Sequence, residues 1–456
     1  MNLKKTGLIA LCIAMSFTSC KGQESKKESK SEKPNIVLLF VDDYGWSDVG
    51  YRNNTFNTPN IDQLKRESLD FNRAYIPTPT CSPSRLSLLT GKEAIRLGMP
   101  RHIAIDPKNP DAEYNLWPTD PVQRPSRNYL PLEEITYAER LKEFGYYNYF
   151  VGKWHLGHQG RYPIDQGFDE EFGTTDHGHP KSYYFPFFKG GDPKGFMKNY
   201  KEGDYLTDVL TDGAVKFIKG YDKDQPFMLS FWYYSVHGPS VGRKDLLKKY
   251  QDAGLEGKYA HHAAMVEAMD ESVGRVRKAL EEKGIADNTV VIVLSDQGGA
   301  YTNAPPLSGG KKGGNTLGEG GARVPFMIYY PEVTTPNTVS NVPVQSIDLY
   351  PTLIEIASGE KYENKDIQGV SLMPLLKGKK IAKRNLYFFR SYEDQYAAVI
   401  SGGDWKLVKY HSGKFQLFNV VKDISEQNDL IGTNLEIETQ LKNEIAAWEK
   451  EAVPTY

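Results

Sequence analysis

The chain has 456 residues but only three cysteines, at positions 12, 20 and 81. A fold held together by several disulfides is therefore excluded. An excess of charge is also missing, because 56 basic residues face 58 acidic ones and the formal net charge is -2. Such a balance creates no long-range field, so we expect no nucleic-acid partner and no electrostatic attachment of the folded body to a membrane.

A long hydrophobic run is absent from the N-terminus as well. Lys4 and Lys5 precede an apolar stretch, Leu8 to Phe17, that is too short to span a membrane and suits a signal peptide. The stretch ends in Phe17-Thr18-Ser19-Cys20, which resembles a bacterial lipobox and implies cleavage before Cys20 and its lipidation. An ordinary signal peptide cut nearby is the alternative. We therefore expect an exported bacterial lipoprotein in the periplasm or at the cell surface, which touches the membrane only through its lipid anchor.

These features predict four segments. Residues 1–20 are a signal peptide, and residues 21–33, rich in Lys, Glu and Ser, form a flexible tether that cannot bury a core. Residues 34–380 form a large catalytic domain, and residues 381–456 form a small C-terminal subdomain. The folded body then contains one cysteine, Cys81, and no internal disulfide.

Four continuous apolar runs predict strands that are buried on both faces of a sheet. They are Asn35 to Val41, Tyr147 to Val151, Phe227 to Trp232 and Thr289 to Leu294. Helical patterns lie between them, the clearest from about Tyr259 to Lys283, followed by Gly284 as a helix stop. The alternation predicts an α/β fold with a large, mostly parallel sheet, and ligands in such folds bind beyond the carboxyl ends of the strands.

The C-terminal part has a different pattern. Short strand-like runs cover Asn385 to Arg390, Tyr396 to Ile400, Trp405 to Tyr410 and Phe415 to Val420, and a helical pattern covers Glu436 to Ala452. We expect a small antiparallel sheet with a terminal helix.

Polar residues follow all four predicted buried strands. They are Asp42 and Asp43 after the first, Lys153 and His155 after the second, His237 after the third, and Asp296 and Gln297 after the last. Carboxylate and amide oxygens suit a hard cation such as Ca²⁺ or Mg²⁺. A single aspartate after a strand is more often a turn or cap residue, so only the combination indicates a metal site.

Cys81 opens the segment Cys81-Ser82-Pro83-Ser84-Arg85. Pro83 suits a first helical turn, which would place Cys81 at a helix N-terminus, where the dipole favours negative charge. Arg85 is one turn away and can reach the same anion with its planar set of donors. A buried structural cysteine is the alternative interpretation.

The Cys-x-Pro-Ser-Arg pattern, followed by Leu88-Leu89-Thr90-Gly91, resembles the type I sulfatases of the alkaline phosphatase superfamily. The resemblance extends over Pro34 to the C-terminal helix, through Gly152-Lys153-Trp154-His155, Asp296-Gln297-Gly298 and Glu319-Gly320-Gly321-Ala322-Arg323. It implies the alkaline-phosphatase-like α/β/α sandwich and a sulfuric ester hydrolase.

By the same resemblance, a separate formylglycine-generating enzyme oxidises Cys81 to formylglycine (3-oxoalanine). One hydroxyl of the hydrated aldehyde attacks sulfur and displaces the alcohol. The second hydroxyl later loses its proton and expels sulfate, which regenerates the aldehyde. The implied Ca²⁺ ligands are Asp42, Asp43, the modified Cys81, Asp296 and Gln297. The implied catalytic residues are Cys81, Arg85, Lys153, His155, His237 and Lys311.

Two positions depart from the usual family pattern. Gln297 stands where Asn or His is more common, although its amide still offers an oxygen. Gly310-Lys311-Lys312-Gly313 offers two candidates for the last active-site lysine, with Lys311 preferred and Lys312 as the alternative.

Weaker signals concern the substrate. Asp176, His177 and His179 lie in a long irregular region and are candidate sugar contacts, as are Arg101, His102 and Arg243. The expected substrate is a sulfated glycan, such as an oligosaccharide from ulvan or carrageenan, or a glycosaminoglycan. Three alternatives remain: a phosphodiester or phosphonate ester hydrolase of the same superfamily, a non-catalytic lipoprotein that binds sulfated glycans, and a hydrolase that uses an unmodified Cys81 thiol.

Overall fold

The computed structural model describes residues 33–104, 109, 112–190, 192, 195–300, 305–390 and 393–455. The predicted signal peptide, the tether and Cys20 lie outside these residues, except for Lys33. Residues 33 to 456 form one compact unit.

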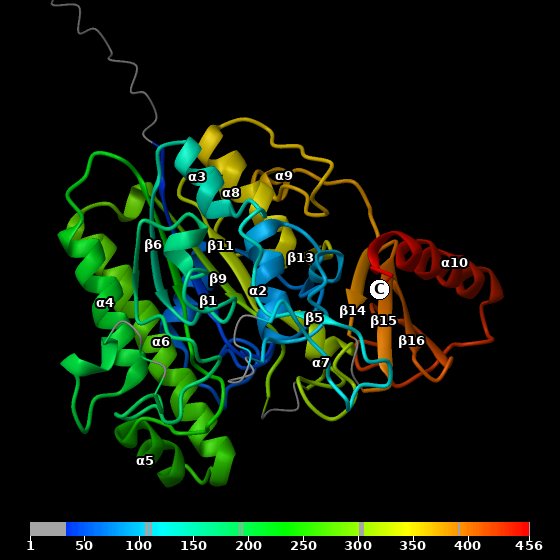
Figure 1. Cartoon of the computed structure of the whole chain (residues 1–456), viewed down its shortest axis with the longest axis horizontal. Helices are drawn as coiled ribbons and strands as arrows, with labels where there is room; N and C mark the ends of the chain where they lie inside the picture. Colours follow the sequence, from blue (N-terminus) through cyan, green and yellow to red (C-terminus); the bar gives the residue numbers. More distant parts are fainter. Residues whose placement is uncertain are drawn as a thin grey trace, which may run out of the picture. The chain divides into compact units, whose positions relative to one another are not determined.

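An eight-stranded sheet lies at the centre of this unit (Figure 1). Its spatial order is β12 (Thr338–Ser340), β2 (Leu69–Phe71), β11 (Phe326–Tyr329), β9 (Thr289–Ser295), β1 (Asn35–Val41), β8 (Phe227–Trp232), β6 (Tyr147–Gly152) and β7 (Glu170–Phe172). Only β11 runs antiparallel to its neighbours β9 and β2. The mostly parallel sheet predicted from the sequence is confirmed, and the four long apolar runs are its central strands.

The sheet is covered on both faces, which explains why its central strands are continuously apolar. In β1, Val37, Leu39 and Val41 belong to one hydrophobic cluster, whereas Ile36, Leu38 and Phe40 belong to the other. The first cluster includes side chains from α1 (Pro59–Glu67), α4 (Leu206–Gly220), α5 (Lys244–Asp252) and α6 (Gly257–Lys283). The second includes side chains from α2 (Cys81–Thr90), α3 (Tyr137–Glu143), α8 (Leu349–Ser358) and α9 (Met373–Leu376).

The C-terminal part forms the predicted antiparallel sheet. Its four strands are β14 (Leu386–Phe389), β15 (Gln395–Ser401), β16 (Trp405–Tyr410) and β17 (Phe415–Asn419). One face packs on α10 (Leu435–Ala452) through Ile445 and Trp448, and the other packs on Tyr75 and Leu317 of the large domain. In Figure 1 this sheet and α10 carry the orange and red end of the colour scale.

Several short strands were not predicted. They are β3 (Ala74–Tyr75), β10 (Arg323–Val324) and β13 (Val344–Gln345), which form a three-stranded sheet, and β4 (Tyr114–Asn115) with β5 (Ser126–Arg127). Runs of two residues have no detectable periodicity, so only tertiary pairing reveals them. The domain boundary near residue 380 remains a prediction.

Candidate active site

The predicted residues meet at one end of the central sheet. Asp42 and Asp43 follow β1, Lys153 follows β6, and Asp296 follows β9, all at the carboxyl ends of parallel strands. Cys81 is the first residue of α2, as expected. Its sulfur and one oxygen each of Asp42 and Asp296 lie within 4.8 Å of one another. The same holds for Cys81, Asp43 and a ring nitrogen of His237.

Buried cations surround the carboxylates. Arg85, with no exposed surface, donates to Asp296 Oδ2 at 2.9 Å and lies 3.7 Å from Asp42 Oδ2. Lys153 Nζ donates to Asp42 Oδ2, and the Arg85 guanidinium also donates to the Lys153 carbonyl at 2.8 Å. The five side chains of this centre therefore include three carboxylates, counting Asp43, and two cations.

Lys311 supplies a third cation. Its Nζ donates to Asp43 Oδ1 at 2.6 Å and to Oδ2 at 2.7 Å. The Asp43 carboxylate, in turn, raises the pKa of Lys311 although burial acts to lower it. Lys312, the alternative, lines the same cleft, but the contacts with Asp43 belong to Lys311. Lys311 is therefore the lysine of the pair that contacts the carboxylates of this centre, and its role as the last active-site lysine remains a prediction.

The Cys81 thiol lies among these cations and is 7% exposed. Burial acts to raise its pKa, yet the ammonium groups of Lys153 and Lys311 hold the pKa of Cys81 well below its ordinary value. Gln297 donates from Nε2 to Cys81 Sγ at 3.2 Å. The surroundings of Cys81 are therefore built to stabilise negative charge, as the helix N-terminus predicts.

The donor set fits a hard divalent cation such as Ca²⁺. Asp42 Oδ1 is buried and has no hydrogen-bond partner among the described residues. Burial and the nearby Asp42 carboxylate raise the pKa of Asp296 to about 7, against the lowering effect of Arg85. Carboxylate oxygens in excess of their partners are what a bound cation compensates. Asp42, Asp43, Asp296 and the Gln297 amide would hold the ion.

Two histidines border Cys81. His155 has a φ of 57°, in the left-handed region, and its ring lies against Gly178, where a Cβ would approach its Cε1 to 2.4 Å. Burial, with Lys153 nearby, lowers the pKa of His155 to about 4. The Nε2 atom of His237 is 3.8 Å from Asp43 Oδ2, and its ring stacks on His179 with centroids 5.6 Å apart. Although burial acts to lower it, Asp43 raises the pKa of His237.

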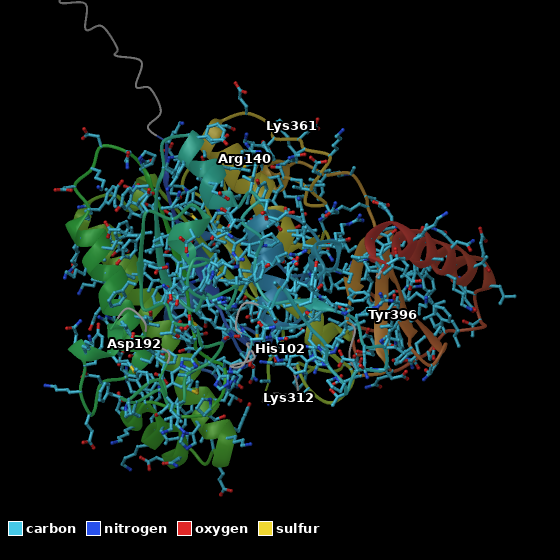
Figure 2. The ribbon with its side chains drawn as sticks, viewed as in Figure 1. His102, Arg140, Asp192, Lys312, Lys361 and Tyr396 are labelled. Atoms are coloured by element: carbon cyan, nitrogen blue, oxygen red, sulfur yellow. The ribbon has the colours of Figure 1, made fainter. Side chains whose placement is uncertain are left out.

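A cleft of about 330 Å³ opens onto Cys81. Its lining includes Asp43, His102, His155, His179, His237, Gln297, Lys311 and Lys312. Figure 2 labels two of the residues that line this cleft, His102 and Lys312. Most of the residues singled out from the sequence therefore meet in one cavity, His102 and His179 among them.

Four predicted substrate contacts lie elsewhere. His177 donates from Nε2 to the Gly190 carbonyl and stacks on Phe188, and Asp176 accepts a hydrogen bond from Tyr162. Arg243 forms ion pairs with Asp208, Asp245 and Glu271. Arg101 pairs with Asp120 and lies over the Trp117 ring. None of the four is among the described residues that line the cleft.

Two charged cleft residues were missed by the sequence interpretation. Arg390 and Glu393, which lie 3.3 Å apart, come from the turn between β14 and β15. They reach the cleft only because the C-terminal sheet docks on the large domain. No local sequence signal could have identified them.

The C-terminal sheet also holds the segment that carries Lys311. Gln395 accepts from the backbone of Leu317 at 2.8 Å, and Glu426 accepts from Ser308 Oγ. Lys406 is fully buried, 3.1 Å from Glu319 and 2.9 Å from Glu426. These contacts fix residues 308–319, a stretch with little regular structure, against β15 and β16.

Comparisons with known proteins agree with this site. A family model described as Sulfatase matches residues 34–359, and one described as "N-sulphoglucosamine sulphohydrolase, C-terminal" matches residues 316–451. N-acetylgalactosamine-6-sulfatase from Homo sapiens is 32% identical over 381 residues, which covers 79% of this chain and 69% of that protein. A protein named Sulfatase from Formosa agariphila is 30% identical over 536 aligned positions, covering 98% and 94%.

A solved structure is also similar over most of this chain. The crystal structure of Ps i-CgsB in complex with k-i-k-neocarrahexaose superposes with a TM-score of 0.76 and 29% identity. The match covers 92% of this chain and 94% of that one.

Proposed function

The chain belongs to the sulfatase family and is a sulfuric ester hydrolase, and from this premise we propose that its substrate is a sulfated carbohydrate. The observation that carries the proposal is the cleft, where Lys311 and two histidines surround Cys81. Two similar proteins support it: one is an N-acetylgalactosamine-6-sulfatase, and the other was solved in complex with k-i-k-neocarrahexaose. Carrageenan, ulvan and glycosaminoglycan oligosaccharides are the substrate classes to compare.

Formylglycine derived from Cys81 would supply a hydroxyl nucleophile. Calcium held by Asp42, Asp43, Asp296 and Gln297 would supply positive charge beside the sulfuryl oxygens. The chain's own cations act in the same sense: Lys153, Lys311 and Arg85 are buried or nearly so, and fixed donors in a water-poor site stabilise developing charge strongly.

The histidines handle protons in this proposal. His155 lies against Gly178 and beside Cys81 in the cleft, and it would accept a proton at the nucleophile. His237 has 19% of its side chain exposed and faces the cleft, where a departing sugar oxygen needs a proton. Two titrating groups in different surroundings suit an acid and a base in one reaction.

The activity is tested by sulfate release from defined sulfated oligosaccharides of the three classes. The protein is produced together with a formylglycine-generating enzyme, and Cys81→Ser is the matched control. Release of inorganic sulfate from at least one oligosaccharide by the matured protein, and not by Cys81→Ser, supports the proposal. Release from aryl sulfate but from no carbohydrate would overturn the carbohydrate assignment.

Maturation is tested separately by mass spectrometry of the peptide that contains residue 81. The proposal expects the mass of formylglycine in active protein. An unmodified thiol throughout fully active protein would instead support a thiol hydrolase.

We also propose that the chain is a lipoprotein anchored through Cys20 in the periplasm or at the cell surface. No helix among the residues that the structure describes is long and apolar enough to cross a membrane. Metabolic labelling with a palmitate analogue tests the anchor, because Cys20→Ala should abolish the label. A label that survives this substitution would contradict it.

A further inference from the structure

A groove where the large domain meets the C-terminal sheet is lined by cations that the reaction does not use. It consists of two adjoining cavities, of about 790 Å³ and about 500 Å³, that share Lys380, Ile381, Ala382 and Arg384. The larger cavity extends along residues 361–371, and the smaller along residues 341–343 and 402–404. We call the pair the basic groove.

The basic groove lies far from the active site. Gln368 and Gly369, which line the larger cavity, donate to the Gly91 carbonyl at the end of α2, whereas Cys81 begins that helix. Ten helical residues span roughly 15 Å. In Figure 2, Lys361 of the larger cavity lies in the upper part of the view, whereas His102 and Lys312 lie in its lower half.

The charge of the basic groove is opposite to that of the whole chain. Six cationic side chains line it, against three carboxylates: Arg73, Lys361, Lys365, Lys380, Lys383 and Arg384 against Glu355, Glu363 and Asp404. The chain as a whole has a net charge of -2. Lys365, Lys380 and Lys383 are exposed. A local positive field on a nearly neutral protein selects polyanions without attracting every acidic partner.

Arg73 gives the basic groove a binding point rather than a charged rim alone. It lines the smaller cavity and is only 7% exposed. Its Nε and Nη2 atoms are buried and are not accessible from the cavity. Its Nη1 atom, which lies near Gly403, is the donor that an oxyanion such as a sulfate ester can reach.

We propose that the basic groove binds a stretch of sulfated polysaccharide outside the active site. One sulfate ester contacts Arg73 in the smaller cavity, and neighbouring sulfates lie along Lys380 and Lys383 toward the larger one. Both cavities are concave, so a chain with sulfates on narrow stems enters them, whereas a flat membrane surface does not reach Arg73. The inference rests on the proposed function, because it assumes a polymeric form of that substrate. Binding at a second site would raise the effective concentration of polymer at the cleft.

The test compares affinity for the polymer with turnover of a small substrate. Binding to ι-carrageenan is measured for Cys81→Ser, which prevents turnover, and for the same protein with Lys380→Gln and Lys383→Gln. The two lysines are exposed, so the fold should tolerate their replacement. Lys248→Gln with Lys278→Gln, exposed lysines of α5 and α6, is the matched control for lost charge.

We expect the groove variant to bind ι-carrageenan about tenfold more weakly or worse, with the loss diminishing as salt is raised. The control should bind as the parent does. In the Cys81-containing background, the groove variant should hydrolyse an aryl sulfate at the parental rate but show a higher KM on the polymer. Arg73→Met, checked for folding by its melting temperature, should weaken polymer binding further.

Three results would overturn the inference. They are unchanged polymer affinity in the groove variant, equal affinity of the parent for chemically desulfated carrageenan, and equal or tighter binding to anionic phosphatidylglycerol vesicles or single-stranded DNA. Failure of the proposed function gives a different result: the parent protein would release sulfate from no carbohydrate, whatever affinity the groove variant has for the polymer.

Discussion

Replacing the two adjacent lysines separately gives the sharpest test of the cleft geometry. Lys311 has 16% of its side chain exposed and lies within 2.7 Å of both Asp43 oxygens, whereas these contacts are not made by Lys312. Removing one fixed donor from a site that stabilises an oxyanion lowers turnover by about 10²- to 10³-fold, or about 2.7–4 kcal/mol. We expect that loss for Lys311→Ala and less than about tenfold for Lys312→Ala, because a more solvated cation contributes little.

The assay is the steady-state kcat/KM on an aryl sulfate, with formylglycine content measured for each variant so that equal amounts of matured site are compared. Stability supplies a second readout. In metal-free buffer, Lys311→Ala leaves Asp43 buried without its closest cation, which costs about 3 kcal/mol of unfolding free energy. An equal or larger loss of kcat/KM in Lys312→Ala would refute the assignment of Lys311 as the active-site lysine.

Three further predictions follow from the described contacts. Calcium should raise the melting temperature by about 2 °C or more and EDTA should reverse the rise, whereas no shift on titration with calcium would contradict the ligand set. Gly178→Ala should reduce kcat by about 10²-fold, because the new Cβ displaces the His155 ring. Gly220→Ala is the control, since a Cβ at Gly220 meets no atom within 4 Å. Unaltered kcat in Gly178→Ala would count against a role for the His155 ring. Lys406→Met should lower the unfolding free energy by about 3–5 kcal/mol, because it leaves the buried Glu426 carboxylate without a cation. Lys409→Met, which removes a more exposed ion pair, should lower it by at most about 1 kcal/mol. Equal losses would show that the buried pair does not stabilise the docked sheet.

The sequence was sufficient to predict the parts of the fold that have long, regular patterns. The runs that became β1 and β8 were predicted residue for residue, because both faces of these strands are buried and nearly every position is apolar. Helix α6 was placed within two residues of its observed start, and Gly284 ends it with a φ of 74°. The position of β11, antiparallel in an otherwise parallel sheet, depends on pairing between distant segments. Its four residues contain no sequence pattern that would predict this pairing.

The site was predicted as far as it is built from strand ends and motifs. Asp42, Lys153 and Asp296 meet because parallel strands deliver their carboxyl ends to one edge. Arg390 and Glu393 were missed because they reach the cleft through the docking of a separate sheet, which no local pattern reports.

Arg243 shows the opposite case. Its charge and loop position suggested a substrate contact, but carboxylates from α4 and α6, Asp208 and Glu271, surround it in the folded chain. A cation in a sequence carries no information about which acids will pack beside it, so such residues are predicted least well.

We propose that Cys81, after conversion to formylglycine, is the nucleophile with which this chain hydrolyses sulfate esters. The ratio of kcat/KM on 4-nitrophenyl sulfate to that on 4-nitrophenyl phosphate, measured for matured protein and for Cys81→Ser, tests this proposal. We expect preference for the sulfate and loss of that activity in Cys81→Ser. A preference for the phosphate, or equal sulfate hydrolysis by Cys81→Ser, would contradict it.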